Sequence, residues 1–284
     1  LRGIVEDVTK RVTLKEGDVV VDIGSNDGTL LSYYPNNLKR VGFEPSAEGF
    51  RYHVEDTKKP LGAKSIVVPE FFNYDDWLRI PDLYPNQAKI ISAISMFYDL
   101  NDPNAFLQDI KKVLAPDGLF VIQQNYLPAM LENNAVDNIV HEHLTYYSLH
   151  TLLPLLNKNG LDIQSVEFND LNGGSFRVYV EHGLHVREQV ADAMLPEVKM
   201  RLDSLAPYKA FRDRVAEIVY RLQTFIPMEK INGRTTYIYG ASTRGATLLQ
   251  YAGLDEKAIP YAVERNPDKV GTMYLGKIPV ISEE

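Results

Sequence analysis

The sequence of 284 residues contains no cysteine, which excludes disulfide bonds and zinc sites built on thiolates. It also contains no apolar run of about 18 residues and no signal-peptide pattern, so we expect a cytoplasmic protein without a transmembrane helix. Runs rich in lysine or arginine are missing too, and the formal net charge is −8. These features argue against a nucleic-acid partner held through phosphate contacts, and we expect small-molecule substrates instead.

The stretch 18–31, with the sequence DVVVDIGSNDGTLL, organises our interpretation of the chain. Its apolar β-formers predict a strand buried on both faces, and the glycines that follow predict a tight turn before a helix. Gly24 and Gly28 let the backbone approach a ligand, and Asn26 between them tolerates a positive φ. We therefore expect the turn to face a ligand at the carboxyl end of the strand.

Glu44 ends the next predicted strand, 40–44, and lies about 20 residues beyond Gly24. In open α/β sheets an acid in this position takes the hydroxyl pair of a ribose, so the spacing predicts a site for an adenosine-type cofactor. The G-x-G-x-x-G pattern of a dinucleotide site is absent. Asp27 stands where a pyrophosphate would arrive and Asp22 precedes the turn, and these acids suit a cation rather than a phosphate.

The segment VDIGSNDGTLL resembles motif I of the class I S-adenosylmethionine-dependent methyltransferases. The resemblance implies S-adenosylmethionine as the cofactor, with Asp22 organising the loop near its methionine moiety. The alternative is an ordinary α/β turn with incidental acids.

Further strands are predicted at 64–68, 89–94 and 119–123, with helices between them. This alternation indicates an α/β fold with a parallel, doubly wound sheet. Two more strands, 161–168 and 175–181, are too close for a crossover helix and must form an antiparallel pair. A parallel sheet finished by a hairpin is the outline of a class I methyltransferase rather than of a dehydrogenase.

Residues 185–230 have a helical pattern, and we expect them to connect a first domain, 1–184, to a partial Rossmann-like unit, 231–284. The second unit has its own strand, glycine turn and helix. Backbone amides, hydroxyls such as that of Ser242, and Arg244 at a helix N-terminus predict a diphosphate cradle. The alternative is a purely structural turn.

Glu70, Phe71 and Phe72 follow the strand 64–68, where this architecture normally holds an adenine. An acceptor for the amino group and an apolar face for the ring are what such a site needs, so we place Glu70 and Phe71 in the cofactor site. Core packing is the alternative for the two phenylalanines.

A polar insert after the strand 119–123 holds most of the candidate catalytic groups. It contains His141, Glu142 and His143, with Tyr126 before them and Tyr146 after. A metal site would have two histidines but no clear third ligand, so we expect no metal. We expect a backbone partner for one histidine and a role as general base for the other, because histidine titrates near neutral pH.

The segments VDIGSNDGTLL, DNIVHEHLTYYSL, NDLNGGSFRVYV and YGASTRGATLL, followed by ERNP, together resemble the nucleotide-sugar C-methyltransferase family. Its members methylate keto-deoxyhexoses attached to a nucleoside diphosphate. The resemblance implies that His143 removes the proton next to the sugar ketone and that Glu142 lies near the sugar. It also implies that Ser242 and Arg244 help to hold the nucleotide-sugar.

Three departures from the family pattern change what we expect. Members usually begin with a cysteine-rich zinc module, which this sequence does not contain. Some carry a tyrosine where this chain has Val140, so stabilisation of an enolate is expected from Tyr98, Tyr126 or Tyr146. The second α/β unit ends at Glu284 after half of the expected lobe, which predicts weakened substrate binding.

The sequence thus predicts a monomeric or dimeric enzyme that transfers a methyl group from S-adenosylmethionine to a carbon next to the ketone of a nucleotide-linked keto-deoxysugar. His143 is our choice of base, with Tyr98 and Tyr146 as the next candidates, and we place His141 and Tyr126 in the substrate site. The alternatives are an O-methyltransferase and a non-catalytic nucleotide-binding domain.

Overall fold

The computed structural model describes residues 1–46, 65–80, 83, 87–185 and 187–284, and they divide into two compact units. Unit 1 comprises Leu1–Tyr126 and Leu144–Lys199, and unit 2 comprises Leu127–His143 and Met200–Glu284. The polar insert therefore belongs with the C-terminal part of the chain. The three-part division expected from the sequence stays a prediction, because the units group residues by contact rather than by position along the chain.

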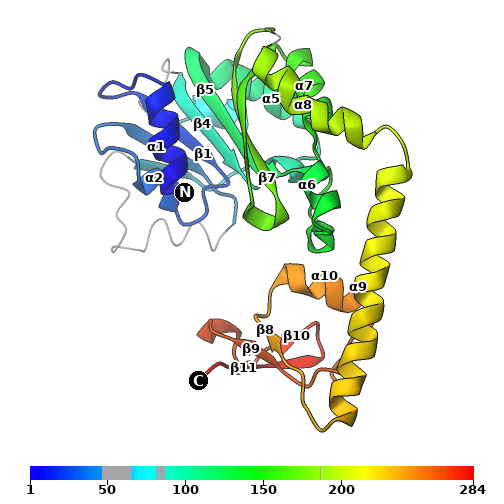
Figure 1. The fold of residues 1–284 in the computed structure, drawn as a ribbon. Coiled ribbons are helices and arrows are strands. Elements are labelled where there is room, and N and C mark those ends of the chain that lie inside the picture. Colours follow the sequence, from blue (N-terminus) through cyan, green and yellow to red (C-terminus); the bar gives the residue numbers. More distant parts are fainter. Residues whose placement is uncertain (47–64, 81–82, 84–86, 186) are drawn as a thin grey trace. The chain divides into compact units, whose positions relative to one another are not determined.

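Unit 1 is built on a seven-stranded sheet in the order β3-β2-β1-β4-β5-β7-β6 (Figure 1). The strands are β1 Val19–Ile23, β2 Lys39–Phe43, β3 Ser65–Val68, β4 Ala88–Ile94, β5 Leu114–Asn125, β6 Leu161–Asn169 and β7 Ser175–His182. The first five are parallel, whereas β7 is antiparallel to both β5 and β6. The predicted doubly wound sheet with a closing hairpin is confirmed.

The helices of unit 1 pack on this sheet. They are α1 Arg2–Arg11, α2 Thr29–Ser32, α4 Tyr74–Leu78, α5 Pro103–Val113, α7 Leu149–Lys158 and α8 Glu188–Met200, with the 3-10 turns η1 Phe97–Asp99 and η3 Leu171–Gly173. Asp102 caps α5 by accepting from the Ala105 amide, and Pro103 occupies its first turn. The short α2 starts at the first glycine turn, as the sequence predicts. The helix expected after Pro45 lies in 47–64, outside the described residues.

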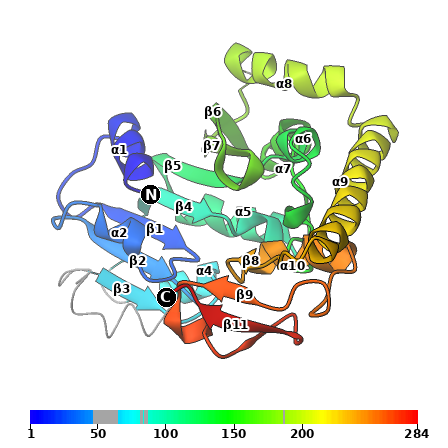
Figure 2. The same ribbon diagram turned by 60° about the horizontal axis from the view of Figure 1, so that its bottom comes forward.

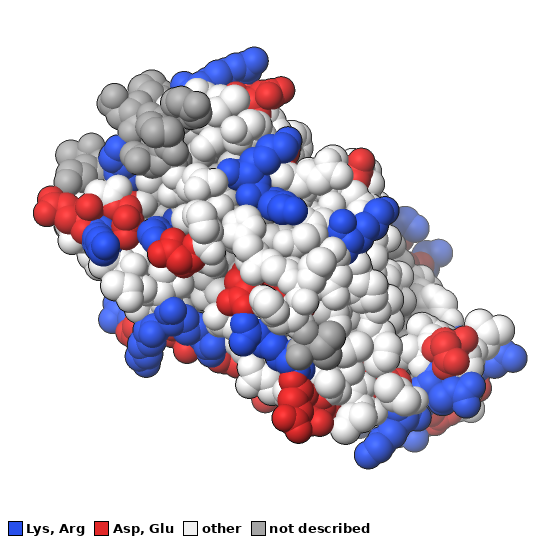
Figure 3. Space-filling model, turned by 90° about the horizontal axis from the view of Figure 1, so that it is seen from above, with Lys and Arg blue, Asp and Glu red and all other residues white. Residues whose placement is uncertain are grey.

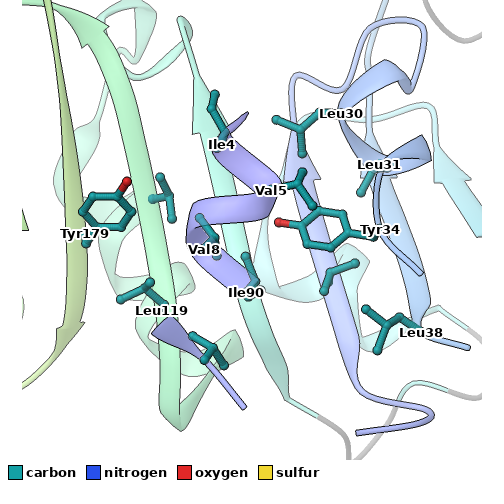
Figure 4. Packing of buried hydrophobic residues seen from close by; sticks show 13 residues of the cluster. Ile4, Val5, Val8, Leu30, Leu31, Tyr34, Leu38, Ile90, Leu119 and Tyr179 are labelled. Carbon is teal, nitrogen blue, oxygen red and sulfur yellow. The ribbon is translucent and has the colours of Figure 1, made fainter. Parts of the chain in front are cut away.

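The apolar stripe of α1 covers one face of the sheet. Ile4, Val5 and Val8 are buried against Ile90 and Leu119 of the central strands, in a cluster that also takes in side chains from α2 (Figure 4). Burial of this apolar area is the main stabilising term for docking the N-terminal helix on the sheet.

The opposite face is covered by aromatic side chains. Phe106 of α5 packs edge-on against Phe97 and Phe72, with ring centroids 5.8 and 5.6 Å apart, and its ring also meets Phe120 of β5. Phe72 in turn packs against Phe43 at the end of β2, at 5.1 Å. These edge-to-face pairs fix the loops at the carboxyl ends of the strands, where the site lies.

The start of β5 differs from the sequence prediction. The sequence predicts a strand from 119, and Pro116, Asp117 and Gly118 before it are residues typical of turns. The strand instead extends back to Leu114, with a register shift against β4 between Ala88 and Ile90. Gly118 sits at this irregularity, and a Cβ there would lie 2.9 Å from the Ala88 carbonyl oxygen. The turn residues thus form a bulge within a paired strand, which propensity alone does not reveal.

Unit 2 has a smaller sheet in the order β10-β11-β9-β8, in which β8, β9 and β11 are parallel (Figure 2). Its elements are α6 Leu127–Glu132, η2 Val136–Asn138, α9 Ala206–Ile231, β8 Ile238–Tyr239, α10 Thr243–Tyr251, β9 Ala262–Glu264, η4 Pro267–Lys269, β10 Met273–Tyr274 and β11 Ile278–Ser282. The predicted strand, turn and helix after residue 235 are confirmed, with a shorter first strand.

The polar insert is attached to unit 2 through α9. Pro207 lies in the first turn of this helix, and Phe211 and Val215 on its predicted apolar face are buried. Arg214 donates to the Leu131 carbonyl at 2.6 Å and to the Asn134 side chain at 2.7 Å, which holds the end of α6 against α9.

In the part of the chain that the structure describes, no helix has both the length and the apolar character needed to span a bilayer. On the face that Figure 3 displays, lysine and arginine alternate with aspartate and glutamate, and the residues drawn there form no continuous basic patch.

Candidate functional site

The turn after β1 has the conformation that its glycines predict. Gly24, Asn26 and Gly28 have φ values of 72°, 46° and 71°, the left-handed region that favours glycine and asparagine. The amides of Gly24 and Ser25 donate to the Phe43 carbonyl at 2.9 and 3.1 Å, so the turn is hydrogen-bonded to the end of β2. Its backbone conformation is therefore fixed before a ligand arrives.

Gly42 of β2 makes this close approach possible. A Cβ on Gly42 would lie 2.6 Å from the hydroxyl oxygen of Ser25, which is buried beneath the turn. Sequence reasoning did not single out Gly42, although a glycine inside a strand is a signal of close backbone approach.

Glu44 ties the two loops of the site together. Its Oε2 accepts from the Asn26 amide at 2.7 Å, and its Oε1 accepts from the Ser46 amide at 2.8 Å. The residue is buried. Each carboxylate oxygen keeps a second lone pair, so Glu44 retains acceptors for the ribose hydroxyls predicted for it.

Asp22 lies at the end of β1, beneath the turn, and is only 4% exposed. Its Oδ1 accepts from the Ser92 hydroxyl of β4 at 2.6 Å. The pKa of the carboxyl is raised to about 7, mainly by burial and in part by the negative charge of Glu44, against the lowering effect of the Ser92 hydrogen bond. A buried carboxyl whose pKa lies near neutral pH, and for which the described residues show no cationic partner, fits a site that receives a positively charged group.

Asp27 has a more local role than the sequence implied. Its Oδ1 accepts from the Thr29 amide at 3.0 Å, the first amide of α2. The carboxylate thereby satisfies a helix-terminal donor. Its predicted place in the cofactor site stays a prediction.

The predicted adenine-binding residues separate into two environments. Phe72 is buried in the aromatic cluster, whereas Phe71 is 77% exposed and Glu70 is exposed beside it. Core packing therefore accounts for Phe72 alone. Phe71 and Glu70 remain accessible at the carboxyl end of β3, and their role toward adenine stays a prediction.

Three tyrosines of unit 1 were predicted near the reacting centre. Tyr98 is buried in η1, and its carbonyl accepts from the amides of Leu144 and Thr145 at 3.1 and 3.2 Å. Tyr146 is half-buried, and burial raises the pKa of its hydroxyl, which keeps the group protonated and able to donate. Tyr98 and Tyr146 thus belong to one loop cluster in unit 1.

Tyr126 is engaged by a residue that sequence reasoning missed. Its hydroxyl donates at 2.8 Å to Glu197, a fully buried acid of α8. Glu197 also accepts from the Leu149 and His150 amides at 2.6 and 2.9 Å and contacts His150 Nδ1 at 2.7 Å. The acid thereby caps the N-terminus of α7. Sequence patterns gave no signal for it, because an acid on a helix usually faces solvent.

His143 of unit 2 has one ring nitrogen fixed. Its Nδ1 lies 2.8 Å from the carbonyl oxygen of Asn138. A carbonyl only accepts, so Nδ1 carries the proton and Nε2 keeps a lone pair. Burial lowers the pKa of His143, and the positive charge of Arg244 lowers it further, against the raising effects of Asn138 and Glu142. The neutral form, which a base requires, is favoured.

His141 and Glu142 are far more accessible than His143. Their side chains are 88% and 61% exposed, with 3.8 Å between His141 Nε2 and Glu142 Oε1. His141 and Glu142 lie in a turn. The different exposures nevertheless separate them, with His143 held by the backbone and His141 in solvent.

The second glycine turn and the insert meet within unit 2. Arg244 in the first turn of α10 forms an ion pair with Asp137 of η2, each side chain about one third exposed. Ser242 caps α10 by accepting from the Gly245 amide at 3.1 Å, and its carbonyl accepts from the Tyr274 hydroxyl at 2.5 Å. The predicted phosphate residues and the predicted base thus share one compact unit. Asp137 and Asn138 were in the insert but received no role from the sequence.

Glu264 at the end of β9 repeats the arrangement of Glu44. Its Oε2 accepts from the Ala241 amide of the glycine turn at 3.0 Å, and its Oε1 accepts from the amides of Arg265 and Asn266 at 2.9 and 3.1 Å. These backbone donors hold the pKa of Glu264 below its ordinary value. Both α/β turns are therefore closed by an acid from the following strand.

Among the residues that the structure describes, no group of three or more His, Asp or Glu side chains is placed to hold a metal ion. Each unit holds its own candidate site. In unit 1 it is the first turn with its acids, and in unit 2 it is the group formed by His143, Asp137 and Arg244. Sheet order, turn conformation and the buried acid at the end of β1 define a class I methyltransferase. The side-chain-free approach at Gly24 and the free lone pairs of Glu44 fit S-adenosylmethionine.

Comparison with known families agrees with this class. Residues 2–166 match the methyltransferase domain, which is more than half of the chain, and the chain belongs to that family. Residues 170–284 match the C-methyltransferase C-terminal domain. The protein is an S-adenosylmethionine-dependent methyltransferase, as the first turn predicted.

Individual relatives cover different shares of the chain. The C-methyltransferase NovU of Streptomyces niveus is 29% identical over 289 residues, which span 100% of this chain and 67% of NovU. A tRNA U34 carboxymethyltransferase of Campylobacter lari is 28% identical over 116 residues, 39% of this chain and 37% of that protein. The YcgJ protein of Bacillus subtilis superposes with a TM-score of 0.50 at 12% identity, over 65% of this chain and 98% of that one, which supports the fold alone.

Proposed function

We propose that the enzyme transfers a methyl group from S-adenosylmethionine to a carbon next to the ketone of a nucleotide-linked keto-deoxysugar. The observation that carries the proposal is His143, whose Nδ1 is held by the Asn138 carbonyl so that Nε2 is a neutral proton acceptor. The match to a C-methyltransferase C-terminal domain and the similarity to NovU favour carbon as the acceptor.

His143 Nε2 takes the proton from the carbon next to the ketone, and the electron pair of that C–H bond forms an enolate. S-adenosylmethionine, when bound, supplies an electrophilic methyl group, with the thioether as leaving group. The enolate would accept that methyl group on its carbon, and the proton would stay on His143 until solvent removes it. Positioning of the base and the acceptor supplies much of the acceleration.

Hydroxyl donors of unit 1 are proposed to stabilise the enolate oxygen. Tyr98 and Tyr146 lie in one loop cluster, and Tyr146 keeps its proton because burial raises its pKa. Tyr126 was expected to help, but its hydroxyl already donates to Glu197. We therefore favour Tyr98 and Tyr146 as donors to the developing charge.

The cofactor is proposed to lie along the first turn. Glu44 would accept from the ribose hydroxyls, and Asp22 would face the methionine end, where the positive charge of the cofactor offsets the cost of a buried carboxylate. Glu70 and Phe71, both exposed at the end of β3, would hold the adenine.

The nucleotide part of the substrate is proposed to lie on the second turn. Arg244 offers a planar fork for phosphate oxygens, and Ser242 adds the capped N-terminus of α10. Glu142 and His141, both exposed beside the base, would contact the sugar.

The test is the variant His143→Asn with His141→Asn as its matched control. We expect His143→Asn to lower turnover by roughly 10²–10⁴ and to leave S-adenosylmethionine affinity within a small factor, while His141→Asn does less. Exchange of the substrate's α-proton with solvent, measured with an unreactive cofactor analogue, reports proton abstraction without methyl transfer. Exchange that persists in His143→Asn would refute the base assignment.

Product analysis by carbon NMR tests the acceptor atom. A new methyl group on carbon is expected from a panel of nucleotide keto-sugars. A methyl group on oxygen would make the enzyme an O-methyltransferase. Tight cofactor binding with no transfer to any member of the panel would favour a non-catalytic nucleotide-binding role.

A further inference from the structure

Asp137 links two parts of unit 2 that are far apart in the sequence. It lies in η2, within the insert, and pairs with Arg244 at the start of α10. The two elements pack against each other. Asp137 therefore pairs with the Arg244 guanidinium, which the proposed function assigns to the substrate's diphosphate.

Asn138, the residue after Asp137, contacts the proposed base His143. Asn138 is only 1% exposed, and its carbonyl is the partner of His143 Nδ1. A movement of η2 that follows a change at Arg244 is therefore transmitted to the hydrogen bond that orients the imidazole. Asp137, Asn138 and His143 form one short segment, so this link needs no long chain of contacts.

Charge decides which partner Arg244 prefers. A partly exposed ion pair with a carboxylate changes an equilibrium constant by only a few-fold. A diphosphate carries more negative charge, fits the guanidinium fork and also interacts with the α10 N-terminus. A carboxylate and a diphosphate close together repel each other, so both cannot share Arg244 at low cost.

We propose that Asp137 is an internal counter-ion that the diphosphate of the nucleotide-sugar displaces from Arg244, and that this exchange is transmitted through Asn138 to His143. The proposal rests on the proposed function, because it requires Arg244 to bind the nucleotide. Asp137 then sets nucleotide affinity and makes the base respond to the part of the substrate that is remote from the reacting carbon, a specificity device of the induced-fit kind.

The test measures the affinity of dTDP, UDP and GDP for the whole protein by calorimetry. Asp137→Asn removes the competing charge, and we expect its Kd for the nucleotide that binds to fall about 2- to 5-fold. Asp137→Glu keeps the charge and should not tighten binding. Asp213→Asn is the matched control, because Asp213 of α9 loses the same charge from an exposed pair with Arg212. Arg244→Gln should weaken binding.

A purely structural role for Asp137 gives the opposite sign, with weaker binding in Asp137→Asn. Unchanged or weaker binding there, with weaker binding in Arg244→Gln, overturns the exchange and leaves the proposed nucleotide site standing. Unchanged binding in Arg244→Gln, or no binding to the wild type, overturns both.

The transmission to the base has its own readout. In ¹⁵N-labelled protein, the His143 imidazole resonances, assigned with His143→Asn, should shift on saturation with the nucleotide. In Asp137→Asn the resonances of the free protein should already lie toward the bound position. A His143 resonance that the nucleotide does not move refutes the link through Asn138.

Discussion

Asp22→Asn is expected to make the protein more stable and a poorer methyltransferase at the same time. The wild-type carboxyl is buried at the end of β1 with one hydroxyl partner, Ser92, and burial raises its pKa from 3.8 to about 7. Asparagine is nearly isosteric, keeps an acceptor for the Ser92 hydroxyl, and carries no charge. The substitution therefore isolates the cost of the buried negative charge.

The magnitude follows from the pKa shift. A folded-state pKa above the unfolded value means that the folded protein binds the proton more tightly, so stability is fully present below pH 3.8 and falls as the pH rises toward 7. At about 1.36 kcal/mol per pH unit, the shift of about 3 units corresponds to about 4 kcal/mol above pH 7. Between pH 5 and pH 8 the stability of Asp22→Asn relative to the wild type should grow by about 2–3 kcal/mol.

Urea denaturation of both proteins without cofactor, at pH 5 and pH 8, measures this difference. Calorimetry at pH 8 measures the other half of the prediction, a loss of about 1.5–3 kcal/mol in S-adenosylmethionine affinity when the charged acceptor is removed. A stability difference that does not change with pH would refute the electrostatic account of Asp22. Unchanged cofactor affinity would refute its place beside the methionine moiety.

Three further substitutions test the turn and the buried network. Gly24→Val should abolish cofactor binding in calorimetry, because Gly24 has φ 72° and a β-branched residue is strained there; retained affinity would contradict this. Glu44→Ala should weaken cofactor binding by about 1.5–3 kcal/mol, since the turn loses the acceptor for the Asn26 amide as well as the ribose contacts, and an unchanged Kd would place the cofactor elsewhere. Tyr126→Phe should lower the free energy of unfolding by about 1 kcal/mol through loss of the bond to Glu197, and an unchanged urea midpoint would argue against that bond.

Local patterns predicted the central strands of unit 1 because strands such as β1 are buried on both faces and consist of nearly continuous apolar residues. The hairpin of β6 and β7 followed from the short connection between them, and the positive φ values followed from Gly24, Asn26 and Gly28. These features depend on residues that are neighbours in the sequence, where propensity and sterics act directly.

Contacts between distant segments were not predictable in the same way. The pair of Asp137 and Arg244 joins residues 107 positions apart, and Glu197 reaches Tyr126 across 71. From sequence alone, charged residues on helices and in polar loops are predicted to be solvent-exposed. Only the three-dimensional structure shows which of them are paired. Glu264 is different, because an acid at the end of the strand after a glycine turn repeats the signal that identified Glu44, and the sequence could have shown it.

The two glycine turns share one backbone arrangement but differ in the charges beside them. In each, an acid at the end of the following strand accepts hydrogen bonds from backbone amides of two loops, Glu44 in unit 1 and Glu264 in unit 2. The remaining charges then select the ligand. The first turn has Asp22 beneath it, which favours a cationic cofactor, whereas the second has Arg244 in its helix and the Lys269 ammonium on the Ala241 carbonyl, which favours an anion. We therefore expect these flanking charges, rather than the glycines, to decide which charge of ligand each turn binds.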